Sequence, residues 1–129
     1  MSEVGLEELV VDDPDGLSLA RMAAQVAEEK KATDIVVLDV GPVLSITGWF
    51  VVASASNRRL VRTVAEEIEA EAKARLGRSP VRVEGLREQQ WVLLDYGDVV
   101  VHVFLDEIRD FYDIERLYRD VAHVEWADA

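Results

Sequence analysis

The sequence predicts a single α/β domain with a mixed sheet of about five strands and flanking helices. Segments with the 3.6-residue apolar period of amphipathic helices alternate with short runs of β-branched residues. The length of 129 residues suits one domain that buries its own core. The chain has no cysteine, which excludes a disulfide, a thiolate zinc site and a cysteine nucleophile.

The N-terminal part of the chain predicts a tail followed by a helix. Residues 1–16 are acidic and contain the turn signal DDPDG, so we expect them to form a flexible tail. A helix is expected from Leu17 to Ala32, with Ser18 as its N-cap. We expect the folded domain to span residues 17–122 and a second tail to span residues 123–129.

The middle of the chain predicts three strands and the longest helix. Two apolar runs, DIVVLDV at 34–40 and GWFVVASA at 48–55, are typical of strands buried on both faces. A single apolar stripe predicts a helix over residues 57–76, which Gly77 ends. Residues 79–85 predict a short edge strand that begins near a proline.

The run WVLLDYGDVVVHVF, residues 91–104, predicts a β-hairpin with two different faces. With Tyr96 and Gly97 at the centre of the turn, Trp91 lies opposite His102. One face is aliphatic and should pack under the helices; it holds Val92, Leu94, Val99, Val101 and Val103. The other face is aromatic and polar, and we expect it to be a partly exposed recognition surface. It holds Trp91, Leu93, Asp95, Asp98, Val100, His102 and Phe104.

Two short helical pieces are expected after the hairpin, between residues 106 and 118. Their apolar stripe consists of Phe111, Ile114, Leu117 and Tyr118, whereas Tyr112 falls on another side. This stripe either docks on the sheet or extends the aromatic surface of the hairpin.

Candidate catalytic groups are incomplete. His102 lies four residues, roughly 13 Å, from Asp98 along a strand, which argues against a direct histidine–carboxylate pair, and His123 supplies no metal-ligand spacing. Asp34 and Asp39 could hold a metal in a nucleotidyltransferase-like enzyme, but no paired carboxylates follow them. The loop before the long helix has no glycine to approach a phosphate, although Arg58 and Arg59 lie nearby. We therefore expect no catalytic residue, metal or cofactor. The alternative is a nucleotidyltransferase-like enzyme that depends on a metal.

The formal net charge of −12 limits the classes of partner. An acidic chain repels nucleic-acid phosphates and suits a basic protein partner; the alternative is that the charge serves solubility alone. No apolar run reaches the roughly 18 residues of a membrane span, and the N-terminus does not resemble a secretory signal. We expect a cytoplasmic protein that forms a homodimer when free or binds another protein.

Several fragments in order resemble the ribosomal silencing factor family, also called Iojap-like proteins. They are KKATDIVVLDV, SITGWFVVASASNRRLVRTVAEEI, VEG, WVLLDYGDVVVHVF and RDFYDIERLY, within residues 20–120. Two positions depart from the family pattern: Gly48 replaces a usual Asp, and Tyr118 stands where a Trp is usual.

The resemblance implies a fold related to nucleotidyltransferases but without their catalytic apparatus. It also implies binding to a large-subunit ribosomal protein, uL14, which blocks subunit joining and lowers translation when nutrients are scarce. The positions that match the family's C-terminal residues are Trp91, Asp95, Gly97, Asp98, His102, Arg109, Tyr112, Glu115 and Leu117. Among these and their neighbours, the expected partner-binding residues are Trp91, Asp95, His102, Phe104, Arg109, Tyr112, Leu117 and Tyr118, with Gly97 as a structural turn residue.

Overall fold

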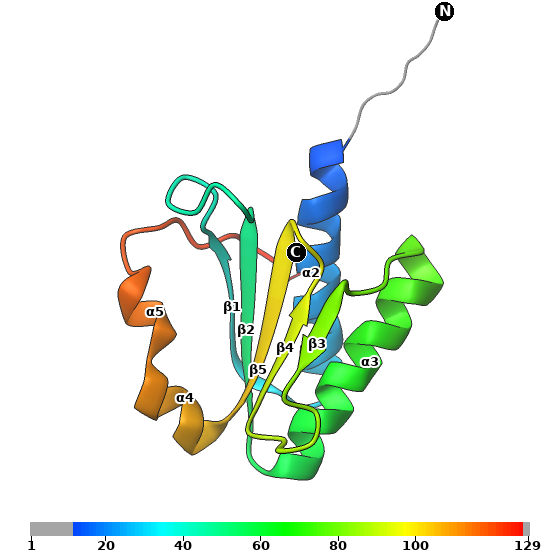
Figure 1. Cartoon of the computed structure of the whole chain (residues 1–129), viewed down its shortest axis with the longest axis vertical. Coiled ribbons are helices and arrows are strands. Elements are labelled where there is room, and N and C mark those ends of the chain that lie inside the picture. Colours follow the sequence, from blue (N-terminus) through cyan, green and yellow to red (C-terminus); the bar gives the residue numbers. More distant parts are fainter. Residues whose placement is uncertain (1–11, 128–129) are drawn as a thin grey trace, which may run out of the picture.

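A five-stranded mixed sheet forms the centre of the protein, and helices cover both of its sides (Figure 1). The structure is a computed structural model, and it describes residues 12–127. The elements in chain order are α2 (Asp12–Glu29), β1 (Thr33–Asp39), β2 (Trp49–Ala55), α3 (Arg58–Leu76), β3 (Arg82–Glu84), β4 (Trp91–Asp95), β5 (Val99–Leu105), α4 (Asp106–Tyr112) and α5 (Ile114–Leu117). The predicted order of helices and strands and the predicted mixed α/β sheet are confirmed.

The strands follow the order β1-β2-β5-β4-β3 across the sheet. The central strands β2 and β5 are parallel, and every other neighbouring pair is antiparallel. Because β2 and β5 have neighbours on both sides and helices above and below, nearly all their residues are buried. The short strand β3 lies at an edge of the sheet, as its proline-led sequence predicts.

One face of the sheet packs against α2 and α3 and forms the larger core. The hairpin contributes its aliphatic side chains to this core, and each of them is fully buried: Val92, Leu94, Val99, Val101 and Val103. The helices contribute the apolar stripes that their 3.6-residue period predicts, such as Val61, Val64 and Ile68 of α3. The predicted aliphatic face of the hairpin is therefore confirmed.

The opposite face carries a smaller core beneath α4 and α5. Leu38, Val40, Phe50, Val52 and Phe104 are buried there, and partly buried side chains from the C-terminal part of the chain pack on them. These covering residues include Ile108, Ile114, Tyr118 and Val121. The hairpin face that we expected to be partly exposed is therefore closed at the end that lies under α4 and α5.

The long helix α3 begins and ends where its sequence predicts. The side chain of Asn57 accepts a hydrogen bond of 2.8 Å from the backbone N–H of Leu60, which caps the first turn. Gly77 ends the helix with a φ of 65°, and its backbone N–H bonds back to the last turn.

Helix α2 begins five residues before the expected start at Leu17. Pro14 lies in its first turn, where backbone N–H groups have no partner within the helix, so the proline does not interrupt it. Ser18 lies inside the helix and is not its N-cap. Residues 12–16, which we expected to belong to the tail, therefore form the start of α2. Residues 1–11 lie outside the described residues.

The chain after residue 122, which we expected to be a tail, runs along the outer edge of β1. The backbone N–H of Val124 donates to the carbonyl of Val37 at 2.8 Å, and Leu38 pairs with His123. Trp126 packs against the larger core, and its carbonyl accepts a hydrogen bond from Gln25. This segment covers an edge that would otherwise leave backbone groups unpaired.

The register of the hairpin differs from the predicted one by two residues. Trp91 lies opposite Phe104, and His102 lies opposite Leu93. The backbone N–H of Tyr96 donates to the carbonyl of Val99 at 2.9 Å, so Gly97 and Asp98 are the central turn residues, and Gly97 has a φ of 92°. Glycine therefore takes the first central position rather than the second. Because a shift of two keeps the alternation, the two faces are unchanged.

Within residues 12–127, no helix is both long enough and apolar enough to span a bilayer.

Candidate functional site

An aromatic cluster around Trp91 occupies the face of the sheet opposite α2 and α3. The ring of Trp91 stacks on Phe104 with centroids 4.8 Å apart, and it lies 5.0 Å from the ring of Tyr112. Beside them, Phe50 meets the imidazole of His102 edge-on at 4.7 Å. Strands β2, β4 and β5 and helix α4 thus bring together aromatic residues that are distant in the sequence.

His102 is a neutral histidine with a fixed tautomer. The indole N–H of Trp91 donates to His102 Nδ1 at 3.1 Å. Because an indole N–H can only donate, Nδ1 accepts, and the single proton of the neutral ring lies on Nε2. Burial lowers the pKa of His102 to about 4, so the ring is neutral at pH 7. Nε2 is buried and has no hydrogen-bond partner within residues 12–127.

The two acids of the hairpin bind arginines and do not contact His102. Asp95 accepts a hydrogen bond of 3.1 Å from Arg82. Asp98 is bound by Arg78 at 2.7 Å. Both acids lie at the turn end, so the interpretation that separates them from His102 agrees with the geometry.

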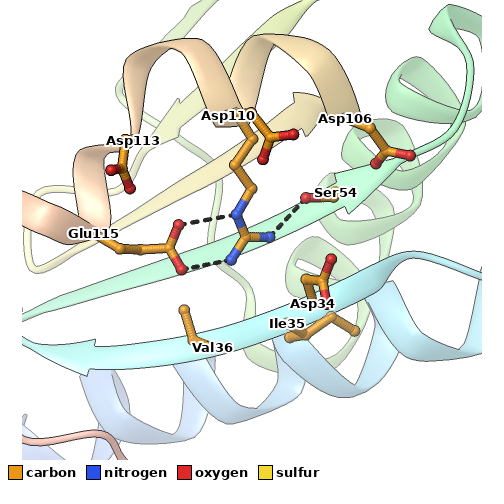
Figure 2. A pocket seen from close by; sticks show the side chains of 9 residues that line it. Asp34, Ile35, Val36, Ser54, Asp106, Asp110, Asp113 and Glu115 are labelled. Carbon is orange, nitrogen blue, oxygen red and sulfur yellow. Dashed lines mark hydrogen bonds and ion pairs between the residues drawn. The ribbon is translucent and has the colours of Figure 1, made fainter.

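An acidic hollow with a volume of about 570 Å³ lies where the start of β1 meets α4 and α5 (Figure 2). Its lining residues are Asp34, Ile35, Val36, Ser54, Asp106, Arg109, Asp110, Asp113 and Glu115. The guanidinium of Arg109 donates hydrogen bonds to both carboxylate oxygens of Glu115, at 2.9 and 2.7 Å. A third bond of 2.6 Å joins Arg109 to the hydroxyl of Ser54. Arg109 therefore fastens α4 and α5 to the end of β2.

The electrostatics of this hollow are dominated by carboxylates. Desolvation raises the pKa of Asp106, and the negative charges of Glu107, Asp34 and Asp110 raise it further. Such a field attracts cations. However, the described residues contain no group of three or more histidine, cysteine, aspartate or glutamate side chains arranged to hold a metal ion.

An apolar groove with a volume of about 360 Å³ lies beside the aromatic cluster and shares Phe50 and His102 with it. Its lining residues are Leu44, Ile46, Thr47, Phe50, Val81, Arg82, Leu93, Asp95, Gly97, Val100 and His102. Ile46 and Val81 at its rim are 86% and 78% exposed, which is unusual for aliphatic side chains near a core. The hydroxyl of Thr47 is buried and, like His102 Nε2, has no partner in the described part of the chain.

Three of the eight expected partner-binding residues are buried. The exposed fractions of His102, Phe104 and Arg109 are 5%, 0% and 8%. Phe50 and the C-terminal helices cover them, so they expose almost no area in this conformation. Each holds a neighbour in place, and their part in partner binding stays a prediction.

The other five expected residues reach the surface to different degrees. Tyr112 and Leu117 are 51% and 76% exposed. Trp91, Asp95 and Tyr118 are half-buried, and the ring of Tyr118 lies 5.2 Å from that of Phe50. The predicted stripe of the C-terminal helices is divided, because Ile114 and Tyr118 dock on the sheet whereas Leu117 faces outward. Gly97 is a turn residue, as expected.

The residues that complete the groove were not predicted from the sequence. Ile46 and Thr47 come from the loop before β2, and Val81 comes from the segment before β3. An isoleucine in the loop GPVLSITG is a weak signal of an exposed apolar site. No sequence signal indicates that this loop lies beside Val81, because the sheet brings them together.

Asp34 and Asp39, which we considered as metal ligands of an enzyme, do not share a site. They lie near opposite ends of β1, and the irregularity at Asp34 keeps their separation below the roughly 16 Å of five extended residues. Asp34 belongs to the acidic hollow, and Asp39 pairs with Trp49 at the other end of the strand. Arg58 and Arg59 are exposed at the start of α3.

Known proteins are similar to this chain over nearly its whole length. The ribosomal silencing factor RsfS of Bacillus subtilis is 35% identical over 103 residues, which are 80% of this chain and 86% of that protein. A mouse protein named mitochondrial assembly of ribosomal large subunit protein 1 is 29% identical, over 75% of this chain and 43% of its own length. A crystal structure of a Chromobacterium violaceum protein matches with a TM-score of 0.77 and 34% identity, over 88% of this chain and 92% of that one.

The family model that describes a ribosomal silencing factor during starvation matches residues 13–129. This match begins in the first turn of α2 and includes the acidic hollow, the apolar groove and the aromatic cluster. Together with the 35% identity to the Bacillus subtilis protein, it leads to one conclusion: the chain belongs to the ribosomal silencing factor family, RsfS.

Proposed function

We propose that this protein is a ribosomal silencing factor that binds the large ribosomal subunit through a basic ribosomal protein, uL14. Bound at the intersubunit face, it blocks joining of the small subunit and so represses translation when nutrients are scarce. The observation that carries the proposal is the family match over residues 13–129. The mouse relative, whose name refers to assembly of the large subunit, supports the choice of subunit.

The charge of the chain suits this partner. A net charge of −12 disfavours direct binding to ribosomal RNA and favours encounter with a basic protein on the same subunit. Blocking of subunit joining is steric, so it requires affinity and bulk but no catalytic group. We therefore assign this protein a regulatory role and no cofactor.

We place the contact surface on the hairpin and the two C-terminal helices. Trp91, Asp95, Tyr112, Leu117 and Tyr118 supply its accessible area. Aromatic residues of this kind dominate the energetics of many protein interfaces. Under them, His102, Phe104 and Arg109 hold the contact residues in position, through the indole bond, the stacked ring and the Glu115 pair respectively.

A subunit-joining assay tests the proposal. Purified large subunits are saturated with the protein, small subunits are added, and the joined ribosomes are measured by sucrose-gradient sedimentation. We expect the joined fraction to fall as the protein co-sediments with large subunits. Unchanged joining at saturating protein would refute the silencing function.

A paired variant test locates the contact surface. Trp91→Ala should weaken binding to the large subunit while the far-ultraviolet circular dichroism spectrum stays that of the folded domain. Glu66→Gln on the exposed side of α3 is the matched control, since α3 lies on the other face of the sheet. Equal affinity of both variants would remove Trp91 from the contact.

A further inference from the structure

The apolar groove contains two buried polar atoms without a partner. His102 Nε2 and Thr47 Oγ1 both belong to residues that line it, and neither has a hydrogen-bond partner within residues 12–127. Buried polar groups are nearly always paired, and an unpaired donor costs the full loss of its hydration. Both atoms are covered in this conformation, so a molecule in the groove pairs with them only after the side chains that line it move.

The chemistry of the missing partner follows from the tautomer of His102. Because the indole of Trp91 donates to Nδ1, Nε2 carries the proton and is a donor. The matching group is therefore an oxygen acceptor. A purely hydrocarbon ligand would leave this donor unpaired, so a lipid chain does not fit. A cation does not fit either, because the ring presents a proton and not a lone pair to the groove.

The rest of the groove is built for an aliphatic or aromatic side chain. Phe50, Leu93 and Val100 line it, and the exposed side chains of Ile46 and Val81 stand at its rim. A volume of about 360 Å³ admits one or two such side chains. Protein segments combine an apolar side chain with a carbonyl oxygen a few ångströms away, which an ion does not.

We propose that the groove receives an apolar side chain of the partner protein, and that His102 Nε2–H donates a hydrogen bond to a carbonyl or carboxamide oxygen of the same partner segment. The inference rests on the proposed function, since it takes the partner to be the basic ribosomal protein that the acidic charge of this chain favours. His102 thus recognises the partner from beneath the surface, and Trp91 sets the tautomer that allows it.

Four proteins test the role of the donor: wild type, His102→Phe, His102→Gln and Tyr96→Phe. Phenylalanine keeps an aromatic ring but removes both the donor to the groove and the acceptor for Trp91, whereas glutamine keeps both groups. Tyr96 is the matched control, because its hydroxyl is also buried without a partner in the described residues but its ring belongs to the larger core on the opposite face.

Affinity for isolated uL14 and for purified large subunits is the first measurement. His102→Phe should raise the Kd about tenfold or more, because the partner's oxygen then stays unpaired at a buried contact. His102→Gln and Tyr96→Phe should stay within about threefold of wild type. If wild type binds and His102→Phe binds equally well, the groove inference is overturned while the proposed function stands. If wild type does not bind at all, both are overturned.

A second measurement holds even if His102→Phe fails to fold. The imidazole Nε2–H signal of the wild-type protein, followed by nitrogen-15 NMR, should move downfield and exchange more slowly with water when uL14 is added. Ile46→Asp, at a site that is 86% exposed, should abolish this change without unfolding the protein. An unchanged Nε2–H signal at saturating uL14 would overturn the inference.

Self-association is the remaining outcome. If the free protein sediments as a dimer that Ile46→Asp disrupts, and if the same variant binds uL14 like wild type, then the occupant is a second copy and the inference is overturned.

Discussion

The two faces of the sheet are covered to different degrees (Figure 1). On the face under α2 and α3, the five aliphatic side chains of the hairpin are fully buried: Val92, Leu94, Val99, Val101 and Val103. On the opposite face, two helices of 7 and 4 residues cover only one end, where Phe104 is buried. The other end is the apolar groove, with its exposed rim and two buried polar atoms that have no partner within residues 12–127. The same five strands thus supply stability on one side and, as we propose, a surface for recognition on the other.

Leu93 and Leu94 test the difference between the two faces most directly, because they are neighbours on β4 that point to opposite faces. Leu94 is fully buried, and Leu94→Ala should lower the free energy of unfolding by about 2–5 kcal/mol. Leu93 is half-buried in the groove, so Leu93→Ala should cost less stability but weaken binding to large subunits. Urea denaturation and subunit binding are measured for both variants. Equal losses of stability would contradict this difference.

The assignment of the hairpin residues to two faces was largely predictable from the sequence, whereas the side chains that cover the second face were not. Alternation along a strand fixed which hairpin residues share a face, and a register error of two residues left the faces intact. The turn could not be placed, because either Gly97 position suits a two-residue turn. Asn57 and Gly77 were predictable as helix caps because capping is local. The burial of His102 was not, since Phe50 lies 52 positions earlier in the chain.

The ion pair between Arg109 and Glu115 holds α4 and α5, the short helices that cover one end of the sheet face opposite α2 and α3. Arg109 is 9% exposed and Glu115 is 32% exposed at the side chain. Glu115→Gln should lower the free energy of unfolding by about 2 kcal/mol, less than the ~3–5 kcal/mol for a fully buried pair, because water screens the partly exposed carboxylate.

The control for Glu115→Gln is Glu66→Gln, which breaks a pair with Arg62 whose side chains are 48% and 49% exposed. That change should stay within about 0.5 kcal/mol. Urea denaturation measures both. If the two variants lose the same stability, Arg109 does not anchor the C-terminal helices.

The pH dependence of stability reports the burial of His102. Its pKa is lowered from 6.5 to about 4 in the folded protein, so the unfolded chain binds the proton first as the pH falls. The contribution is complete above pH 6.5 and is lost as the pH falls toward about 4. Between pH 7 and pH 5 it should amount to about 1–2 kcal/mol.

Comparison with His102→Gln isolates this contribution from the carboxylates. Asp106 and Glu69 have raised pKa values, so they act in the opposite direction and stabilise the fold as the pH falls. They are present in both proteins and cancel in the difference. Parallel curves for the two proteins between pH 7 and pH 5 would mean that His102 is accessible to water in the folded state.

The smallest effect on stability is expected at Leu117. Its effect on binding tests whether α5 belongs to the contact surface. Its side chain is 76% exposed at the end of α5, so Leu117→Ser should change the free energy of unfolding by less than about 0.5 kcal/mol. If α5 belongs to the contact surface, the same substitution should weaken large-subunit binding about fivefold, because an apolar contact is lost. Leu76→Ser at the end of α3 is the matched control on the other side of the sheet. Equal binding by the two variants would make α5 only a cover for the aromatic cluster, and the recognition surface would then shrink to the hairpin and the groove.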